Sequence, residues 1–317
     1  MSGTEPILFS SPLQGFTDFR FRSAFQEYFG GIDQYFAPYI RLQKGQIKAS
    51  NKRDILMENN QKINLVPQLM TKDVEEFLSI AAYVRELGYG EVNWNLGCPY
   101  PMVAKRGMGS GMLNAPEKID EILSAVFARS EIRISVKMRL GYEKPDEILS
   151  ILPLLDKHPL ENICIHPRIG TQIYKGGVNL EGFEACLRLT KHRILYNGDI
   201  KSVQDFRSMK KRFPQIEHWM IGRGLIADPF LPSMIKTNSL EYPADARERF
   251  SDFHDTLLTA YSEALSGQKH ILLRMYQFWG YFIQLFPGAP KGLKKIRKAQ
   301  NLEVYQAEVK NIIRSGL

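Results

Sequence analysis

A cysteine stands where a strand is expected to end and a loop to begin. Cys98 lies in the stretch NLGCPYP (95–101), before a loop with glycines at alternate positions. Free cysteine often behaves as a small hydrophobic residue, which suits Cys164 and Cys186 in their apolar runs. A thiol beside glycine, at the start of such a loop, is open to a ligand. We predict that Cys98 does chemistry, either as a nucleophile, which needs the thiolate, or as an acid, which needs the thiol.

Two glycine-bearing segments, YNGDI (196–200) and IGRGLIADP (221–229), predict a phosphate site. Glycine lets backbone N–H groups approach an anion closely, and Arg223 adds a fixed positive charge. Lys137, in the run RISVKMRL, is placed where a cation could hold an electron-rich ring. Together these residues favour a cofactor that carries phosphate.

Eight short β-rich runs would position these residues. Helical patterns lie between several of them, for example over 71–88 and 115–130. Alternating strands and helices predict a (β/α)8 TIM barrel, with functional residues at the C-terminal ends of the strands. A doubly wound open sheet is the alternative, but no GxGxxG follows the first strand. The eight expected strands lie within 7–11, 34–40, 63–69, 91–96, 133–140, 162–168, 193–199 and 218–224.

The pattern changes near the stretch EYPADA (241–246), after which no strand is evident. Amphipathic helical patterns run from there to the end of the chain, interrupted by PGAP (287–290). We therefore expect a barrel domain over 1–240 and a small all-α domain over 241–317.

The charge distribution indicates an anionic partner. The net charge is +8 and the isoelectric point is near 9.2. Residues 269–317 hold nine basic and two acidic residues, and KGLKKIRK follows the aromatic stretch MYQFWGYF. A charge run is often only a solvated helix face, but this density beside aromatic residues favours RNA. The predicted phosphate contacts are Lys291, Lys294, Lys295, Arg297 and Lys298.

The three cysteines form no CxxC pair and do not suggest a disulfide framework or a zinc site. We see no signal peptide and no apolar run of about 18 residues, the length needed to cross a membrane. We therefore expect a cytoplasmic monomer with neither a membrane nor a metal partner.

Seven motifs together resemble the flavin-dependent tRNA-dihydrouridine synthases, and the likeness extends over nearly the whole chain. The tail RMYQFWGYFIQLFPGAPKGLKKIRKAQN is similar to the helical domain of the bacterial C-type members. The motifs are SPLQGFTDFRFR, PQL, NLGCPYPMVAKRGMGSGML, VKMRLGY, IHPRIGTQIYKGG, YNGDI and IGRGLIADP.

The resemblance implies FMN at the top of the barrel, NADPH as reductant and a tRNA D-loop uridine as substrate. In that family reduced flavin delivers hydride to C6 of the uracil and the loop cysteine protonates C5, which makes Cys98 the general acid. By resemblance, Asn95, Arg139, Arg168 and Gln172 contact uracil or nearby RNA. The implied FMN site comprises Pro12, Leu13, Gln68, Lys137, His166, Asn197, Gly198, Asp199, Gly222 and Arg223.

Two other functions compete with this one. An FMN barrel could act on a small molecule, as dihydroorotate or dihydropyrimidine dehydrogenases do, but a basic helical appendage is not needed for that. A non-catalytic RNA-binding protein could keep the fold, but the presence of Cys98, Lys137 and His166 argues against it.

Overall fold

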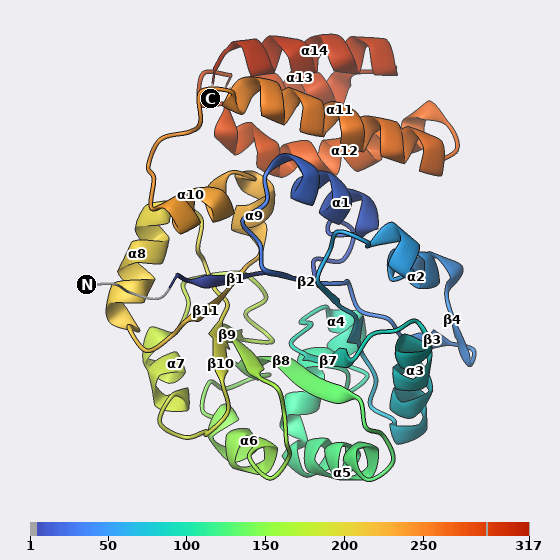
Figure 1. Ribbon diagram of the computed structural model, residues 1–317, viewed down its shortest axis with the longest axis vertical. Coiled ribbons are helices and arrows are strands. Elements are labelled where there is room, and N and C mark those ends of the chain that lie inside the picture. The colour runs from blue at the N-terminus through green and yellow to red at the C-terminus, as the bar shows by residue number, and fades with distance from the viewer. Residues whose placement is uncertain (1–4, 290, 317) are drawn as a thin grey trace.

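A closed parallel sheet forms the centre of the computed structural model, which describes residues 5–289 and 291–316 (Figure 1). Its strand order is β5-β2-β1-β11-β10-β9-β8-β7-β6. Pro67, which has no N–H to donate, separates β5 from β6 within one expected run. Because β5 pairs with β2 and β6 with β7, that run closes the barrel and confirms the eight expected strands. The strands are β1 (Ile7–Ser10), β2 (Gln34–Phe36), β5 (Leu65–Val66), β6 (Gln68–Leu69), β7 (Glu91–Leu96), β8 (Arg133–Gly141), β9 (Ile163–Ile169), β10 (Ile194–Tyr196) and β11 (His218–Ile221).

Helices surround the barrel, and their apolar faces pack on it. In α3 the spacing of Phe77, Ile80, Ala81 and Val84 puts four buried side chains on one face, and Asp73 caps the first turn. Helices α3 and α5 confirm the patterns expected over 71–88 and 115–130. The surrounding helices are α1 (Phe19–Tyr28), α2 (Ala49–Asp54), α3 (Val74–Glu86), α4 (Pro101–Ala104), α5 (Pro116–Phe127), α6 (Ile148–Leu155), α7 (Leu180–Cys186), α8 (Val203–Arg212), α9 (Arg223–Ala227) and α10 (Leu231–Thr237), with 3-10 turns η1 (Met57–Asn59) and η2 (Gly109–Asn114).

A short hairpin follows β2 and was not expected from the sequence. It pairs β3 (Leu42–Gln43) with β4 (Gln46–Ile47). Its two-residue turn places Lys44 at φ 52° and Gly45 at φ 75°. Two consecutive residues with positive φ are typical of the turn that joins tightly paired strands. The Lys-Gly sequence is a weaker signal for that turn than Asn-Gly or Asp-Gly.

The C-terminal region is helical, as expected, and lies at the top of Figure 1 beside α1 and α9. Aromatic side chains join it to the barrel: the ring centroids of Phe29 and Phe253 are 4.8 Å apart, and Phe21 stacks on Phe278 at 5.7 Å. The apolar core is continuous across the join, so a domain boundary at residue 240 stays a prediction. The helices are α11 (Ala246–Ala264), α12 (Gln268–Phe282), α13 (Gly292–Lys298) and α14 (Leu302–Arg314), with the 3-10 turn η3 (Ile283–Leu285).

Among the described residues, no helix combines the length and the apolar character that crossing a membrane requires.

Candidate active site

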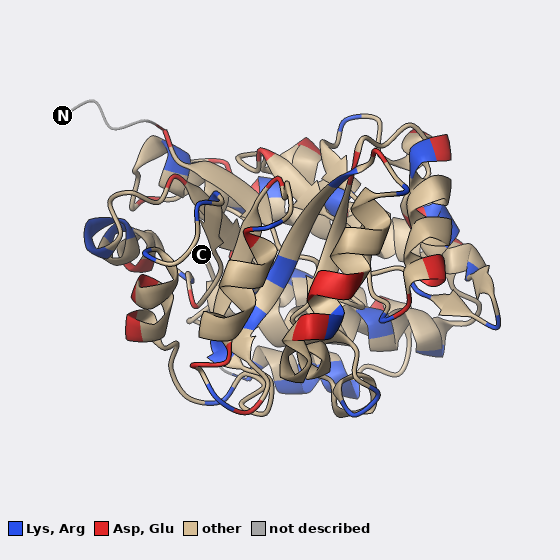
Figure 2. Cartoon of the chain, turned by 90° about the horizontal axis from the view of Figure 1, so that it is seen from below, with Lys and Arg blue, Asp and Glu red and all other residues tan. Residues whose placement is uncertain are grey.

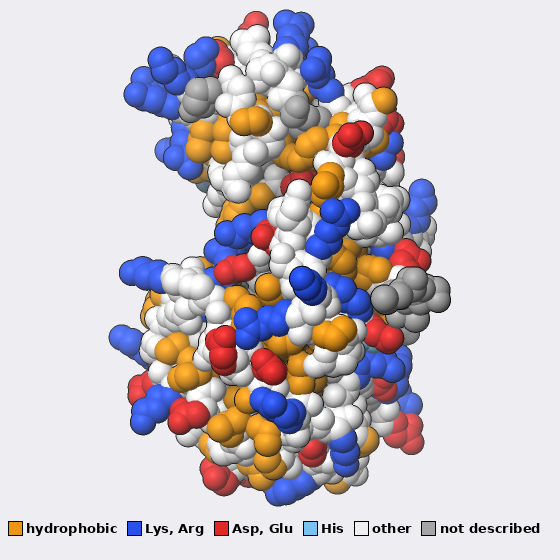
Figure 3. Space-filling model, turned by 90° about the vertical axis from the view of Figure 1, so that its left-hand side faces the viewer, with side chains coloured by type: hydrophobic (Ala, Val, Ile, Leu, Met, Phe, Trp, Pro, Cys, Tyr) orange, Lys and Arg blue, Asp and Glu red, His pale blue; other side chains and the backbone are white. Residues whose placement is uncertain are grey.

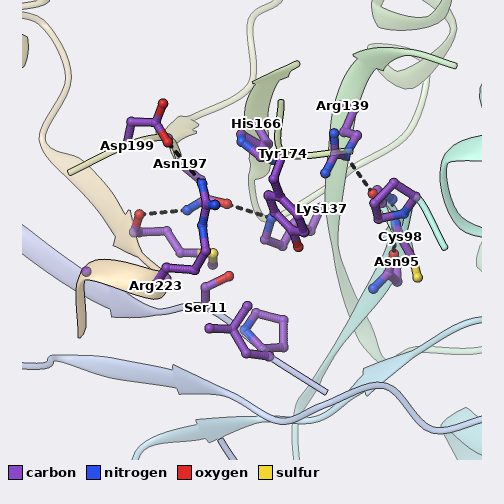
Figure 4. Close-up of a pocket in the computed structure, with 18 of the residues that line it drawn as sticks. Ser11, Asn95, Cys98, Lys137, Arg139, His166, Tyr174, Asn197, Asp199 and Arg223 are labelled. Carbon is purple, nitrogen blue, oxygen red and sulfur yellow. Dashed lines mark hydrogen bonds and ion pairs between the residues drawn. The ribbon is translucent and has the colours of Figure 1, made fainter. Parts of the chain in front are cut away.

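A pocket opens at the C-terminal ends of the barrel strands, where the barrel prediction placed the functional residues. In Figure 4, Asp199 and Arg223 lie at one end of the group of labelled side chains and Asn95 and Cys98 at the other, with His166, Lys137 and Tyr174 between them. The pocket is lined by Ser11, Pro12, Leu13, Gln14, Tyr39, Asn95, Gly97, Cys98, Pro99, Lys137, Arg139, His166, Tyr174, Asn197, Gly198, Asp199, Ile200, Lys201, Met220, Gly222, Arg223 and Gly224.

The backbone of Cys98 is fixed from both sides. The Asn95 Oδ1 atom accepts the N–H of Gly97 at 3.0 Å and that of Cys98 at 2.9 Å. The carbonyl of Cys98 accepts the Ser110 hydroxyl at 3.0 Å. Gly109 lies so close that an added Cβ would be 2.7 Å from the Cys98 carbonyl oxygen. The glycine in this loop therefore allows the loop to pack against Cys98.

The environment of Cys98 favours the thiol over the thiolate. Burial raises the pKa of Cys98, although the N–H of Tyr100 and the charge of Arg139 act in the opposite direction. A raised pKa keeps the proton on sulfur at neutral pH. This suits an acid better than a nucleophile, a choice that the sequence by itself left open.

A chain of buried polar side chains runs from the bottom of β7 to Asn95. The Nδ2 of Asn95 donates to Gln68 at 2.7 Å, and the Nε2 of Gln68 donates to Asn93 at 2.7 Å. Asn93 in turn donates to Ser135 at 3.0 Å, and Ser135 donates to Glu91 at 2.6 Å. Every donor points toward the Glu91 carboxylate, so the chain fixes which way the Asn95 amide faces.

Arg139 ties the cysteine loop to the loop after β9. Its Nε donates to the carbonyl of Gly97 at 3.0 Å, and its Nη1 donates to the carbonyls of Ile169 at 2.8 Å and Ile173 at 2.7 Å. Burial lowers its pKa to about 10, which leaves the guanidinium charged at neutral pH. Arg139 lines the pocket while bracing both loops, and its contact with uracil stays a prediction.

Tyr174 was not among the expected site residues, although the motif IGTQIYKGG contains it. Its ring lies 4.5 Å from the guanidinium carbon of Arg223 and 5.4 Å from that of Arg139. The side chain is 43% exposed and lines the pocket. The sequence feature that could have identified Tyr174 is an aromatic residue in a glycine-bearing loop after a barrel strand.

Lys137 and Asn197 meet in the pocket. The Lys137 Nζ atom donates to Asn197 Oδ1 at 2.7 Å, and Asn197 Nδ2 donates to the carbonyl of Met220 at 2.8 Å. Burial lowers the pKa of Lys137. These bonds hold the ammonium group among the pocket-lining side chains.

His166 is neutral and its tautomer is defined by a neighbour. Burial, with the charges of Arg139 and Lys137, lowers its pKa well below the ordinary value. Its Nε2 lies 3.0 Å from an Nη1 of Arg168. Because arginine only donates, Nε2 accepts and the proton sits on Nδ1. The imidazole therefore retains one N–H donor.

Asp199 is held by two arginines. It takes a positive φ of 44° and pairs with Arg168 at 2.5 Å and with Arg223 at 3.1 Å. Burial alone would raise the pKa of Asp199, but its hydrogen bond and ion pair with Arg168 hold the pKa below the ordinary value. Its negative charge is thus compensated inside the protein.

The lining residues fit FMN. Four basic side chains and one acidic side chain face the pocket. At the Arg223 end, the segments 197–200 and 222–224 pack tightly: a Cβ added to Gly224 would be 2.1 Å from the carbonyl oxygen of Ile200. Glycine backbone beside Lys201 and Arg223 suits a phosphate, and Lys137 suits the electron-rich part of a flavin ring.

Three of the residues expected at the flavin or the uracil do not line the pocket. Gln68 is fully buried in the polar chain below Asn95. Arg168 was expected to contact RNA but is 2% exposed and bonded to His166, Asp199 and the carbonyl of Gly176. The Nε2 atom of Gln172 donates to the carbonyls of Lys175 and Gly177 within its own loop. In this structure these residues position others.

Within residues 5–289 and 291–316, no group of three or more His, Cys, Asp or Glu side chains is arranged to hold a metal ion.

The model of a family described as dihydrouridine synthase (Dus) matches residues 9–312. A "tRNA-dihydrouridine(16) synthase" of Pseudomonas syringae pv. tomato is 30% identical over 233 residues, which cover 71% of this chain and 73% of that protein. A "Probable tRNA-dihydrouridine synthase" of Helicobacter pylori (strain J99) is 28% identical over 248 residues, or 75% of this chain and 72% of that protein.

Solved structures with the same fold are more distant in sequence. Morphinone reductase aligns with a TM-score of 0.52 and 13% identity, over 77% of this chain and 93% of its own. A 2-naphthoyl-CoA reductase aligns with a TM-score of 0.56 and 11% identity, over 74% of this chain and 50% of its own. At these identities the likeness shows the barrel fold alone.

Proposed function

Because the chain belongs to the dihydrouridine synthase family, we propose that it reduces the C5=C6 bond of a uridine in tRNA, with FMN as cofactor and NADPH as reductant. The observation that carries the proposal is the protonated Cys98 thiol in a pocket that also holds Lys137, His166 and a cationic end at Arg223. An acid facing a flavin-type site can complete the addition of two hydrogens across a double bond.

When bound and reduced by NADPH, the flavin would supply the hydride for C6. Lys137, Asn197 and the Nδ1–H of His166 would bind and orient its ring system, a role supported by their shared place in the pocket. Arg223, Lys201 and the glycine backbone around 198 and 222 would bind the phosphate, a role supported by the positive charge at that end of the pocket. Arg168 keeps His166 in the donating tautomer and Asp199 in place, which is a positioning role.

Cys98 acts as the general acid at C5. The S–H bond breaks, the proton bonds to C5, and the electron pair stays on sulfur as a thiolate, which solvent later reprotonates. Arg139 and Lys137 carry charges that favour this transient thiolate. Arg139 bonds to the thiol loop at Gly97 and lies beside the Tyr174 ring, and both side chains would orient the uracil.

The helical region is proposed to bind tRNA through contacts to its backbone phosphates. The five expected cations around α13 are all exposed, and only Lys295 has an acidic partner in the described chain, Glu308 at 3.6 Å. Figure 3 shows basic side chains at the upper left of the molecule, above a hollow that separates them from the lower part. Exposed cations near such a hollow suit backbone contacts that do not read sequence.

A direct experiment tests the function. Purified protein is incubated with unmodified tRNA and NADPH, its flavin is identified after release, and dihydrouridine in the tRNA is quantified. We expect FMN and NADPH-dependent dihydrouridine. Dihydrouracil formed from free uracil, with none in tRNA, would favour a small-molecule reductase. A protein without flavin or turnover would favour the non-catalytic RNA-binding alternative.

A further inference from the structure

A second basic surface lies beside the pocket mouth, away from α13. The segment 41–53, here named the basic arm, comprises the β3–β4 hairpin and most of α2. It contains five basic residues and no acidic one. They are Arg41, Lys44, Lys48, Lys52 and Arg53. Figure 2 shows Lys and Arg colour at the right-hand edge, where Figure 1 places this hairpin.

The arm is attached to the active site. It follows β2, so it emerges at the same end of the barrel as the pocket. Tyr39, just before the arm, lines the pocket, and Asn51 of α2 donates to the Tyr39 carbonyl at 3.4 Å. The charge of Arg41 also lowers the pKa of Cys98, although burial dominates there. The arm therefore borders the catalytic thiol.

The charges of the arm are not neutralised within the protein. Lys44, Lys48, Lys52 and Arg53 are exposed, and no carboxylate of the described residues lies within 4 Å of an arm cation. The next acid, Asp54, is buried and faces Arg22 at 3.4 Å. Like charges gathered without partners repel one another, and a polyanion relieves that repulsion.

An exposed aromatic residue adjoins the arm. Tyr100 is 54% exposed and lies two residues after Cys98. Burial, with smaller contributions from Cys98 and Tyr100, raises the pKa of Tyr39 at the base of the arm, so the two tyrosines lie near one another. Lys105 and Arg106 are exposed on the same loop, and Lys72 donates to the carbonyl of Arg106 at 2.8 Å. Cations with an accessible ring are the combination that binds unpaired nucleotides.

We propose that the basic arm and Tyr100 form a second RNA-binding surface, which holds the tRNA backbone and a base next to the uridine being reduced. This inference rests on the proposed function. Figure 1 places the hairpin well away from α13. Contacts at both places would fix the RNA at two separated points, so that one uridine reaches the pocket.

The test compares two triple variants with the same loss of charge. The arm variant is Lys44→Ala, Lys48→Ala and Lys52→Ala. The control is Arg188→Ala, Lys191→Ala and Lys211→Ala, exposed residues that precede β10 and β11 and so belong to the opposite end of the barrel. Affinity for unmodified tRNA is measured over a series of salt concentrations, and thermal unfolding and flavin content check folding.

We expect the arm variant to bind tRNA roughly 10- to 100-fold more weakly near 0.1 M salt, with a log–log salt slope shallower by about 2 to 3. The control variant should match wild type in both. Tyr100→Ala should raise the KM for tRNA, while Tyr100→Phe should keep it.

The outcomes separate the two proposals. Equal affinity and salt slope in the arm and control variants would overturn the second surface, whatever the activity. A wild type that binds tRNA through the arm but forms no dihydrouridine would overturn the proposed function and leave the surface standing. A wild type without tRNA affinity would overturn both.

Discussion

Asn95 holds Cys98 in place: its side-chain oxygen accepts the Cys98 backbone N–H at 2.9 Å. Asn95 is the second-last residue of β7, so a side chain of the strand fixes the first turn of the loop that follows it. Its own orientation depends on Gln68 of the neighbouring strand segment. The position of the thiol is therefore set by buried residues on two strands.

Replacing Cys98 should stop the tRNA reaction without removing flavin. In Cys98→Ala we expect dihydrouridine formation to fall about 10²- to 10⁴-fold, the usual contribution of a general acid. FMN content and flavin reduction by NADPH should stay near wild type. Cys164→Ala, whose thiol is buried beside Met220, and Cys186→Ala should lose modest stability only. Wild-type tRNA modification by Cys98→Ala would refute the assignment.

The pH dependence distinguishes an acid from a nucleophile. The active form of an acid is protonated, and burial raises the pKa of Cys98 in the folded protein. The single-turnover rate with reduced enzyme should thus be level through neutral pH and fall only as pH rises past the ordinary thiol range. In Cys98→Ser the residual rate should lack this alkaline fall. A rate that increases with pH in that range would instead indicate a thiolate nucleophile.

The buried chain below Asn95 can be broken at its far end. Glu91→Leu removes the acceptor of the Ser135 hydroxyl, which should lower the free energy of unfolding by roughly 1–3 kcal/mol. It should also slow tRNA reduction more than flavin reduction, because Asn95 and Cys98 lose their fixed orientation. Glu91→Gln keeps an acceptor at the same place and serves as the control. Chemical denaturation measures the stability and single-turnover kinetics measure the rates. Equal stability and equal rates in the Leu and Gln variants would argue against a role for these hydrogen-bonded side chains in orienting Asn95.

Arg223 should matter for the cofactor more than for RNA. It lines the pocket at the glycine-rich end and its charge is shared with Asp199. Arg223→Ala should lose FMN on dialysis, measured as the flavin-to-protein ratio, while tRNA affinity changes less. Lys211→Ala, an exposed cation on α8, is the control for the loss of charge. If Arg223→Ala retains as much FMN as wild type, the phosphate role is excluded.

We predict that the cations around α13 contribute to the salt dependence of tRNA binding. Replacing Lys294, Lys295 and Lys298 with Ala should weaken binding and reduce the log–log salt slope by roughly one unit per lost phosphate contact. Lys295→Ala alone should have the smallest effect, because Lys295 already pairs with Glu308. Flavin content should not change. An unaltered affinity and slope in the triple variant would mean that α13 is only a solvated helix face.

Local patterns in the sequence were sufficient to predict the barrel architecture and to single out the Cys98 thiol. Strands such as β7 and β9 are buried on both faces, and that continuous apolar character is visible in the residues themselves. Glycine and proline mark where β7 ends, which identified Cys98 as a loop residue. The helical tail and its basic run are likewise local features.

The tertiary structure decided which side chains face the pocket. His166 and Arg168 lie two residues apart in β9, a spacing that puts both side chains on the same face of a strand. Only His166 lines the pocket, because Arg168 pairs with Asp199 from the loop after β10 and is buried. Gln68 pairs with Asn93 across two strands, and Tyr174 meets Arg139 and Arg223 from different loops. Such contacts join residues far apart in the chain, and their distances depend on barrel closure and strand register, which no local pattern contains.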